Sequence, residues 1–336
     1  MGAQIRAIAY CLPDHVETNE DLQRENPDWQ MDRLYEKSGI GSRHIAAPDE
    51  TASDLAFRAA QRLFEKPGVV PEEIDSLIFC TQSPDHYLPS AACVLQDRLR
   101  LGKHVGAFDF NLGCSGYVYG LYMAKCFVEC GQARSVLLLA ADTYSKYIHP
   151  RDRTVRTLFG DGASATLVGR SDAPGLGEFV LGTDGSGAKN LIVPSGCLRL
   201  PRSPATAVEA TDNSGCTRSQ DTLFMDGAAI FTFAITVVPR TIQALLTKAN
   251  LKPEDVDWYV YHQANKFMLE HLAQKSRVPR DRMVLSMEDV GNVVSASIPI
   301  AVQRYVEAGK IRAGHKILMV GFGVGYSWGA CLATWR

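Results

Sequence analysis

The segment NLGCSGY at residues 111–117 joins an apolar run at 105–110 to a second apolar run at 117–130. The first run predicts a β-strand. The second predicts a helix that ends before Gly131, a residue type common just past helix ends. Apolar side chains are spread around most of the circumference of this helix, so we expect it to be buried on several sides. Cys114 therefore stands between the end of a strand and the N-terminus of a helix.

A cysteine in this position suits nucleophilic chemistry. The free N–H groups and the partial positive charge of a helix N-terminus favour a thiolate. The flanking Gly113 and Gly116 leave room for a substrate to approach the sulfur. The alternative is that Cys114 is one more buried small residue, as most free cysteines are. The local pattern leaves both interpretations open.

The composition is typical of a globular protein and limits the function classes. The chain has 336 residues, 46% hydrophobic and 21% charged, with a formal net charge of −2, enough for two packed domains. The chain has no excess of positive charge, so its composition does not suggest nucleic-acid binding. No apolar run approaches the roughly 20 residues of a membrane span. Arg6 interrupts the apolar run at the N-terminus, so we expect no signal peptide.

The nine cysteines are spread along the chain without a CxxC pair. An odd count and the absence of a signal sequence indicate free thiols in a reducing cytoplasm. Cys126 and Cys130 lie four residues apart, but no histidine or second pair accompanies them, so we expect no metal site.

Strand and helix patterns alternate along the chain. We predict strands at residues 3–11, 76–80, 135–140, 163–168, 178–183, 190–194, 258–261 and 316–320, with a last strand ending at 336. We predict helices starting near 18 and at 51–64, 91–99, 228–248, 267–276 and 298–308. Residues 26–50 and 195–221 are predicted to be irregular, with Trp29 exposed. The alternation predicts mostly parallel sheets, which bind ligands beyond the carboxyl ends of their strands.

The two halves of the chain resemble each other. PEEID at 71–75 recurs as PEDVD at 253–257, 182 residues later, and neighbouring helix and strand segments match at nearly the same offset. Several segments in near-constant register predict a duplicated α/β fold with a pseudo-twofold axis. We place the N-terminal half at 1–172 and the C-terminal half at 173–336.

Two polar residues of the second half stand where a pocket can form. His262 directly follows the strand at 258–261, and Asn292 begins a loop that leads into a helix. A lone histidine is more often a surface or core residue, and a Gly-Asn pair is most often a turn. Spacing alone does not join these residues to Cys114.

Three segments resemble the active-site motifs of the β-ketoacyl-acyl-carrier-protein synthase III family: NLGCSG at 111–116, YHQAN at 261–265 and GNVVSASIP at 291–299. Three more are similar to family segments: RHIAAP at 43–48, FGDGA at 159–163 and GVGYSWG at 323–329. The match runs nearly end to end. The resemblance implies the thiolase fold, a five-layered αβαβα duplication, and a homodimer.

The resemblance also implies a decarboxylating Claisen condensation. Cys114 would accept an acyl group from a coenzyme A or acyl-carrier-protein thioester, and a malonyl thioester would then lose CO₂. His262 and Asn292 would donate hydrogen bonds to the enolate oxygen, while the N–H groups of Cys114 and Gly325 would form the oxyanion hole. No metal or other cofactor is expected, since coenzyme A and phosphopantetheine thioesters are the substrates. Relatives that acylate hydroxyls can carry Asp at the position of Asn292, so its amide favours carbon–carbon bond formation.

The departures from the family pattern lie in substrate recognition. We expect substrate contacts at the matching positions, which are Leu88, Arg33, Lys37, Arg153, Ala228, Asn265 and Phe267. Arg33 and Lys37 replace the tryptophan and arginine that enclose adenine in fatty-acid-initiating members, and Trp29 is a candidate substitute. Leu88 replaces an aromatic residue at the acyl pocket, which is compatible with a larger acyl group. A specialised pathway is therefore an alternative to fatty-acid initiation.

A cluster of basic residues beside the His262 loop is a candidate dock for an acidic acyl carrier protein: Lys266, Lys275, Arg277, Arg280 and Arg282. A solvated helix face is an equally good explanation. Two further functions remain open: an acyltransferase that uses Cys114 without decarboxylation, and a catalytically idle partner subunit. Retention of the cysteine, the histidine and the asparagine argues against the idle partner.

Overall fold

The computed structural model describes residues 2–173 and 175–336. Five strands form the first sheet, in the order β1-β7-β6-β4-β5. They are β1 (Gly2–Cys11), β4 (Ser76–Cys80), β5 (Gly106–Phe110), β6 (Ser135–Asp142) and β7 (Gly162–Ser171). The second sheet has the order β13-β14-β15-β8. Its strands are β8 (Leu176–Thr183), β13 (Trp258–Tyr261), β14 (Lys316–Gly323) and β15 (Ser327–Thr334).

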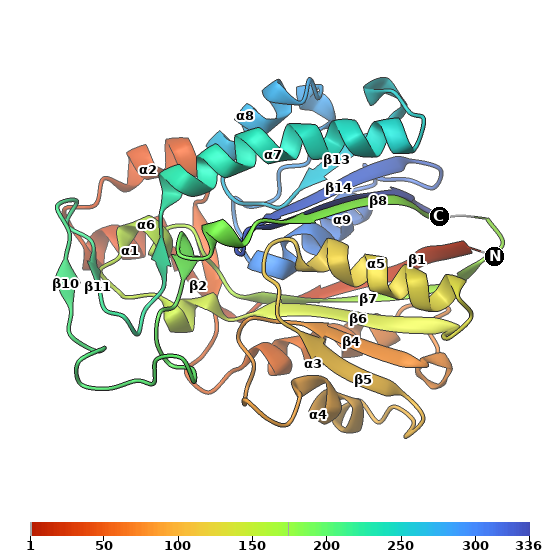
Figure 1. Cartoon of the computed structure of the whole chain (residues 1–336), viewed down its shortest axis with the longest axis horizontal. Helices are drawn as coiled ribbons and strands as arrows, with labels where there is room; N and C mark the ends of the chain where they lie inside the picture. The colour runs from red at the N-terminus through yellow and green to blue at the C-terminus, as the bar shows by residue number, and fades with distance from the viewer. Residues whose placement is uncertain (1, 174) are drawn as a thin grey trace.

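Helices cover both sheets and fill the space between them (Figure 1). The middle layer holds α5 (Gly116–Glu129) and α9 (Ser297–Glu307), whose apolar residues share one buried cluster with strands of both sheets. The outer face of the first sheet carries α3 (Ala52–Phe64) and α4 (Ala91–Arg98). The outer face of the second carries α7 (Gly227–Lys248) and α8 (Lys266–Lys275). This is the predicted five-layered αβαβα thiolase fold.

The internal repeat is confirmed element by element. The series α3, β4, α4, α5, β6, β7 in the first half has the same order as α7, β13, α8, α9, β14, β15 in the second. Each half contributes one sheet, so the pseudo-twofold axis relates the two sheets. The boundary at 172/173 falls between β7 and β8 and stays a prediction.

The expectation of mostly parallel sheets is wrong. Strand β4 pairs in parallel with β5 and β6, and β13 pairs in parallel with β14. The pairs β6–β7, β7–β1, β14–β15 and β15–β8 are antiparallel. No crossover helix separates β14 from β15, and the link between β6 and β7 holds only short helical turns. Parallel neighbours need such a crossover, so these strands return antiparallel.

The region 26–50 is more ordered than predicted. It contains α2 (Met31–Ser38) and β3 (Ser42–Ile45), which pairs with β2 (His15–Thr18). The predicted helix near 18 is α1 (Asn19–Glu25), capped by Thr18. Trp29 is 7% exposed, because it packs with Leu22 and Met31 in a small core under α1 and α2. The exposed Trp29 expected from the sequence is therefore wrong, and this side chain offers no surface for stacking adenine.

The region 195–221 is mostly irregular, as predicted, and contributes the short strands β10 (Ala210–Thr211) and β11 (Thr217–Arg218). The predicted strand at 190–194 is only β9 (Leu191–Ile192), which pairs with β12 (Phe224–Met225). The charged link before β7 includes one helical turn, α6 (Arg153–Arg156).

One helix in the described residues, α7, is long and apolar enough to cross a membrane by length and composition, with a mean hydropathy of 1.6. This corrects the expectation that no stretch comes near that limit. However, 44% of its apolar window is buried inside the protein, where it packs against β8, β14 and β15. The buried residues of α7 form one face of the helix, which lies on the second sheet.

Candidate active site

Cys114 lies between β5 and α5 and is 4% exposed. The end of β14 packs directly on it: a Cβ atom added to Gly323 would lie 3.0 Å from the Cys114 Sγ. A larger residue at 323 would therefore press on the sulfur. The next loop residues, Val324 and Gly325, continue past the cysteine, and Gly325 has φ +133°, which favours glycine.

The thiol of Cys114 is not held as a thiolate in the free protein. Burial, followed by the negative charge of Asp142, raises its pKa to about 12. Main-chain N–H groups of Cys114 and Val324 act in the opposite direction but do not compensate. Desolvation of the buried sulfur therefore opposes the thiolate that the helix N-terminus favours.

His262 follows β13 and is 2% exposed. Its ring meets the Phe322 ring edge-on, with centroids 5.8 Å apart. Its Nδ1 lies 2.7 Å from the Ser297 Oγ at the start of α9. Burial lowers the pKa of His262 to about 3, so the ring is neutral at physiological pH.

Ser297 is the hydrogen-bond partner of His262 Nδ1. Its Oγ lies 2.7 Å from Nδ1 and accepts the Gln263 main-chain N–H at 3.4 Å. When the Ser297 hydroxyl donates to Nδ1, the neutral imidazole carries its hydrogen on Nε2. In that tautomer His262 presents a neutral hydrogen-bond donor at Nε2.

Asn292 is fixed by its main chain and by its side-chain oxygen. Its N–H donates to the Leu158 carbonyl at 2.8 Å, and its carbonyl accepts from the Gly160 N–H at 3.1 Å. The Val294 N–H donates to Asn292 Oδ1 at 3.0 Å. Because Oδ1 is occupied in this way, the NH₂ end of the amide becomes the donor available to a ligand.

The end of β14 brings the three predicted residues together. Gly323 contacts Cys114, and the preceding Phe322 contacts the His262 ring. The main chain of Val294, which holds Asn292, also contacts the His262 imidazole. The thiol and the imidazole thus lie at one strand end, and Val294 connects the Asn292 segment to the imidazole.

Sequence reasoning missed Asp142, the last residue of β6, which is fully buried near Cys114. It accepts from the Gln82 N–H at 2.7 Å and from the Ser295 hydroxyl and N–H at 2.5 and 3.3 Å. Burial raises the pKa of Asp142 to about 7. A carboxylate at the end of the apolar run SVLLLAAD was the signal that could have found it.

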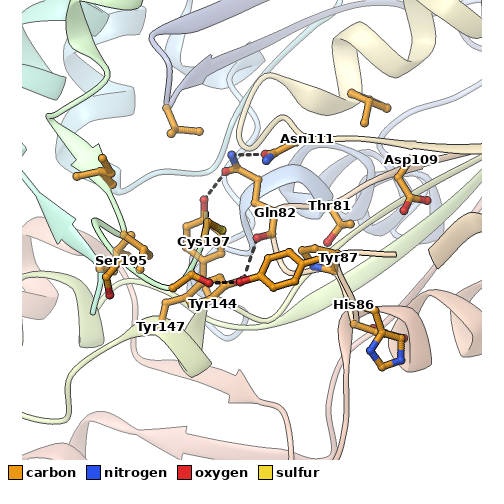
Figure 2. A pocket seen from close by; sticks show the side chains of 18 of the residues that line it. Thr81, Gln82, His86, Tyr87, Asp109, Asn111, Tyr144, Tyr147, Ser195 and Cys197 are labelled. Carbon is orange, nitrogen blue, oxygen red and sulfur yellow. Dashed lines mark hydrogen bonds between the residues drawn. The ribbon is translucent and has the colours of Figure 1, made fainter. Parts of the chain in front are cut away.

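A cavity of about 1340 Å³ opens beside Val324 and Gly325 (Figure 2). Its wall includes Gln82, Asn111 and the three tyrosines Tyr87, Tyr144 and Tyr147. Leu88 lines its rim and is 82% exposed. Leu88 and Gly325 are the predicted site residues that line this cavity.

The other predicted substrate residues lie outside the cavity wall. Arg33 and Lys37 are exposed on α2, and Ala228 is exposed at the start of α7. Phe267 on α8 is 45% exposed and packs on His271, with ring centroids 4.2 Å apart.

Two of these predicted residues have structural partners. The Arg153 guanidinium donates to the Ser214 carbonyl at 2.9 Å. Asn265 caps α8, with its Oδ1 accepting from the Met268 N–H at 2.9 Å. Across residues 2–173 and 175–336, no group of three or more His, Cys, Asp or Glu side chains is arranged to hold a metal ion.

Comparisons with known proteins agree with this fold. The family model described as 3-oxoacyl-[acyl-carrier-protein (ACP)] synthase III matches residues 108–185, and the model of its C-terminal part matches 246–335. The chain is 37% identical to the beta-ketoacyl-[acyl-carrier-protein] synthase III of Caldanaerobacter subterraneus subsp. tengcongensis, over 100% of this chain and 98% of that protein.

Two solved structures extend the comparison. A 3-oxoacyl-(acyl-carrier-protein) synthase III is 48% identical with a TM-score of 0.98, covering 100% of both chains. The priming β-ketosynthase of the R1128 polyketide pathway is 32% identical with a TM-score of 0.87, covering 99% of this chain and 96% of the other. By class, the chain is a condensing acyltransferase of the thiolase fold. Within that class, it belongs to the β-ketoacyl-acyl-carrier-protein synthase III family.

Proposed function

We propose that this protein condenses an acyl thioester with a malonyl thioester in two stages, with Cys114, His262 and Asn292 as catalytic residues. One observation carries the proposal. His262 is buried, neutral and bonded through Nδ1, and Asn292 is bonded through Oδ1, so both residues present N–H donors beside Cys114. Two fixed neutral donors suit an oxygen that gains negative charge.

In the first stage, the Cys114 sulfur attacks the thioester carbonyl carbon. The new Sγ–C bond forms, the bond from carbon to the carrier sulfur breaks, and the thiol proton leaves with the carrier as its free thiol. The N–H groups of Cys114 and Gly325 stabilise the tetrahedral oxyanion. The raised pKa of Cys114 favours loss of the proton during acyl transfer over loss before it.

In the second stage, a malonyl thioester replaces the released carrier. Its carboxylate leaves as CO₂, and the electron pair moves into an enolate whose oxygen accepts hydrogen bonds from His262 Nε2 and Asn292 Nδ2. The enolate carbon then attacks acyl-Cys114, releasing the β-ketoacyl thioester and returning the sulfur as a thiol after protonation. An amide at 292 donates to the enolate, whereas a carboxylate would repel it.

We assign malonyl-acyl carrier protein as the second substrate and an acyl-coenzyme A or acyl carrier protein as the donor, with no metal or further cofactor. Acyl carrier proteins are acidic, and this chain has exposed basic side chains of the opposite charge. Lys266, Lys275, Arg277 and Arg280 are exposed and, in the described residues, form no ion pair. Arg282 instead donates to main-chain carbonyls and has a structural role.

We further propose a cytoplasmic homodimer. Strand β5 lies at the edge of the first sheet and is only partly buried, so its free edge can pair with a second copy. Sedimentation should then give near twice the 36.8 kDa of one chain. All nine cysteines are free in the described chain, as expected in a reducing compartment.

The proposal is tested by separating acylation from decarboxylation. Intact-protein mass spectrometry with an acyl thioester panel measures the Cys114 adduct, and CO₂ release from a malonyl carrier measures decarboxylation. Cys114→Ala should abolish the adduct. His262→Ala and Asn292→Ala should retain the adduct and lose decarboxylation.

The exposed Cys130 provides a matched control, since Cys130→Ala should change neither step. Normal decarboxylation by Asn292→Ala would disprove the role of its amide. An adduct that persists in Cys114→Ala would disprove the nucleophile. Acylation without CO₂ release in the unmodified protein would favour the simple acyltransferase.

A further inference from the structure

The cavity wall is mixed: Val324 and other apolar side chains line it together with a group of hydrogen-bonded polar side chains near Cys114. The Tyr144 hydroxyl donates to Gln82 Oε1 at 2.5 Å, and Gln82 Nε2 donates to Asn111 Oδ1 at 2.9 Å (Figure 2). The Tyr147 hydroxyl donates to the Gln82 carbonyl at 3.0 Å. A phenol and two amides therefore form one connected chain along the wall, which we call the polar wall (Tyr144, Gln82 and Asn111).

The polar wall begins beside the nucleophile. A Cβ atom on Gly113 would lie 2.5 Å from Gln82 Oε1 and 2.7 Å from Val324 Cγ1, so these side chains flank the residue before Cys114. Tyr144 is 4% exposed and belongs to the same buried cluster as Cys114. Burial, followed by the negative charge of Asp142, raises the pKa of Tyr144.

The polar wall keeps hydrogen-bonding capacity after these contacts. Each amide NH₂ has two hydrogens, and the Tyr144 oxygen keeps acceptor lone pairs. A saturated acyl chain would displace the water bound to these groups without replacing its hydrogen bonds. Each buried polar group left without a partner makes binding less favourable. A hydroxyl on the chain would replace the lost water, and sites built around such a group reject analogues that lack it.

We propose that the preferred donor is an acyl thioester with a hydroxyl group within a few carbons of the thioester carbonyl, bound by Gln82 and Tyr144. This inference rests on the proposed acylation of Cys114. In a single chain the cavity has about 1340 Å³, part of it beside β5, where the proposed second copy pairs, and its wall offers selection by hydrogen bonding as well as by size.

The test compares donors that differ only in a hydroxyl for a methyl group. The pairs are the N-acetylcysteamine thioesters of 4-hydroxybutyrate against pentanoate and of 3-hydroxybutyrate against 3-methylbutyrate. Intact-protein mass spectrometry gives the initial rate of the Cys114 adduct. The hydroxylated member of at least one pair should react about tenfold faster, as one satisfied hydrogen bond predicts.

Tyr144→Phe and Gln82→Met should each bring this ratio close to one, because the variant loses the hydrogen bond to the hydroxyl and the polar group that penalises a saturated chain. Two variants are used because either can disturb folding. Tyr259→Phe is the matched control: this buried phenol bonds the Pro253 carbonyl at 2.9 Å outside the cavity, and the ratio should not change.

Equal rates within both pairs would overturn the inference while leaving the proposed acylation intact. A preference that neither wall variant reduces would also overturn it. If no thioester forms an adduct, the proposed acylation fails and this inference fails with it.

Discussion

At the scale of single residues, reactivity follows from what each polar atom is bonded to. His262 and Asn292 each have one polar atom occupied by a fixed partner, so the opposite atom faces the reaction as a donor. Because the folded-state pKa of His262 is lowered to about 3, the neutral ring persists through the physiological range and gains a proton only in strong acid. Under the proposed mechanism, His262 and Asn292 therefore need no proton uptake before decarboxylation.

Ser297→Ala tests the hydrogen-bond partner of His262. Without the hydroxyl, Nδ1 can carry the hydrogen, and Nε2 then faces the enolate as an acceptor. We expect decarboxylation to fall by about tenfold or more, while Cys114 acylation is unchanged. CO₂ release and adduct formation measure the two steps separately.

Ser164→Ala removes another buried hydroxyl, one that has no hydrogen-bond partner in the described structure, and should leave both steps unchanged. Ser297→Thr keeps a hydroxyl and should recover part of the lost decarboxylation. Equal slowing of acylation and decarboxylation by Ser297→Ala would show a general packing defect instead of a tautomer effect.

The raised pKa of Cys114 predicts a steep pH dependence. The folded-state pKa of about 12 leaves the thiol protonated at pH 7, so the thiolate fraction grows about tenfold per pH unit well below that value. Alkylation of Cys114 by iodoacetamide should accelerate continuously from pH 7 to 9.5. Cys114→Ala protein gives the background from the other thiols, and a plateau near pH 7 would contradict the prediction.

At the scale of elements, the candidate catalytic residues are positioned by turns at the ends of strands. Cys114 lies between β5 and α5, His262 directly follows β13, and the Gly323 end of β14 packs between the two halves. The helix after His262 depends on a cap: Asn265 accepts from the Met268 N–H and starts α8. Asn265, which the sequence predicts as a substrate contact, thus caps α8, the helix that follows the His262 loop.

Asn265→Ala should lower the free energy of unfolding by about 1 kcal/mol, because the main-chain N–H of Met268 loses its side-chain acceptor. Asn265→Asp keeps an acceptor and should retain most of the stability. Urea denaturation measures the difference. If the Asn265→Ala and Asn265→Asp proteins unfold at the same urea concentration, Asn265 does not stabilise the protein by capping α8.

At the scale of the whole molecule, the two halves are linked by a buried polar contact near the nucleophile. Asp142 of the first sheet accepts both donors of Ser295, which lies in the loop before α9. Burial raises the folded-state pKa of Asp142 from 3.8 to about 7. Its ionisation therefore lowers stability as the pH rises between these two values.

Ser295→Ala should destabilise the protein by about 2 kcal/mol, since a hydrogen bond to a buried carboxylate is lost. The hydroxyl normally lowers the pKa of Asp142, so its removal raises that pKa further. The loss should thus be larger at pH 8, where Asp142 is ionised, than at pH 5.5, where it is protonated. Urea titrations at both pH values measure this, with Ser164→Ala as the control, and a loss independent of pH would contradict the coupling.

Much of this organisation is predictable from sequence. Apolar periodicity located most strands and helices, the offset between PEEID and PEDVD revealed the duplication, and the Cys114, His262 and Asn292 motifs indicated the family. These signals are short patterns and motifs, or matches between short segments, and each can be recognised without knowing which segments are in contact. The capping positions of Thr18 and Thr51 belong to the same kind of information.

Other features came only from the tertiary structure. Antiparallel pairing of β6 with β7, burial of Trp29, the partner of His262 at Ser297, the Asp142–Ser295 bond and the polar wall all depend on contacts between separate elements. The chain by itself determined which residues are the candidates for the chemistry, because motifs and periodicity are short-range properties. Only the folded molecule decided their protonation and hydrogen-bonding directions, because burial and partners are set by segments distant in the sequence.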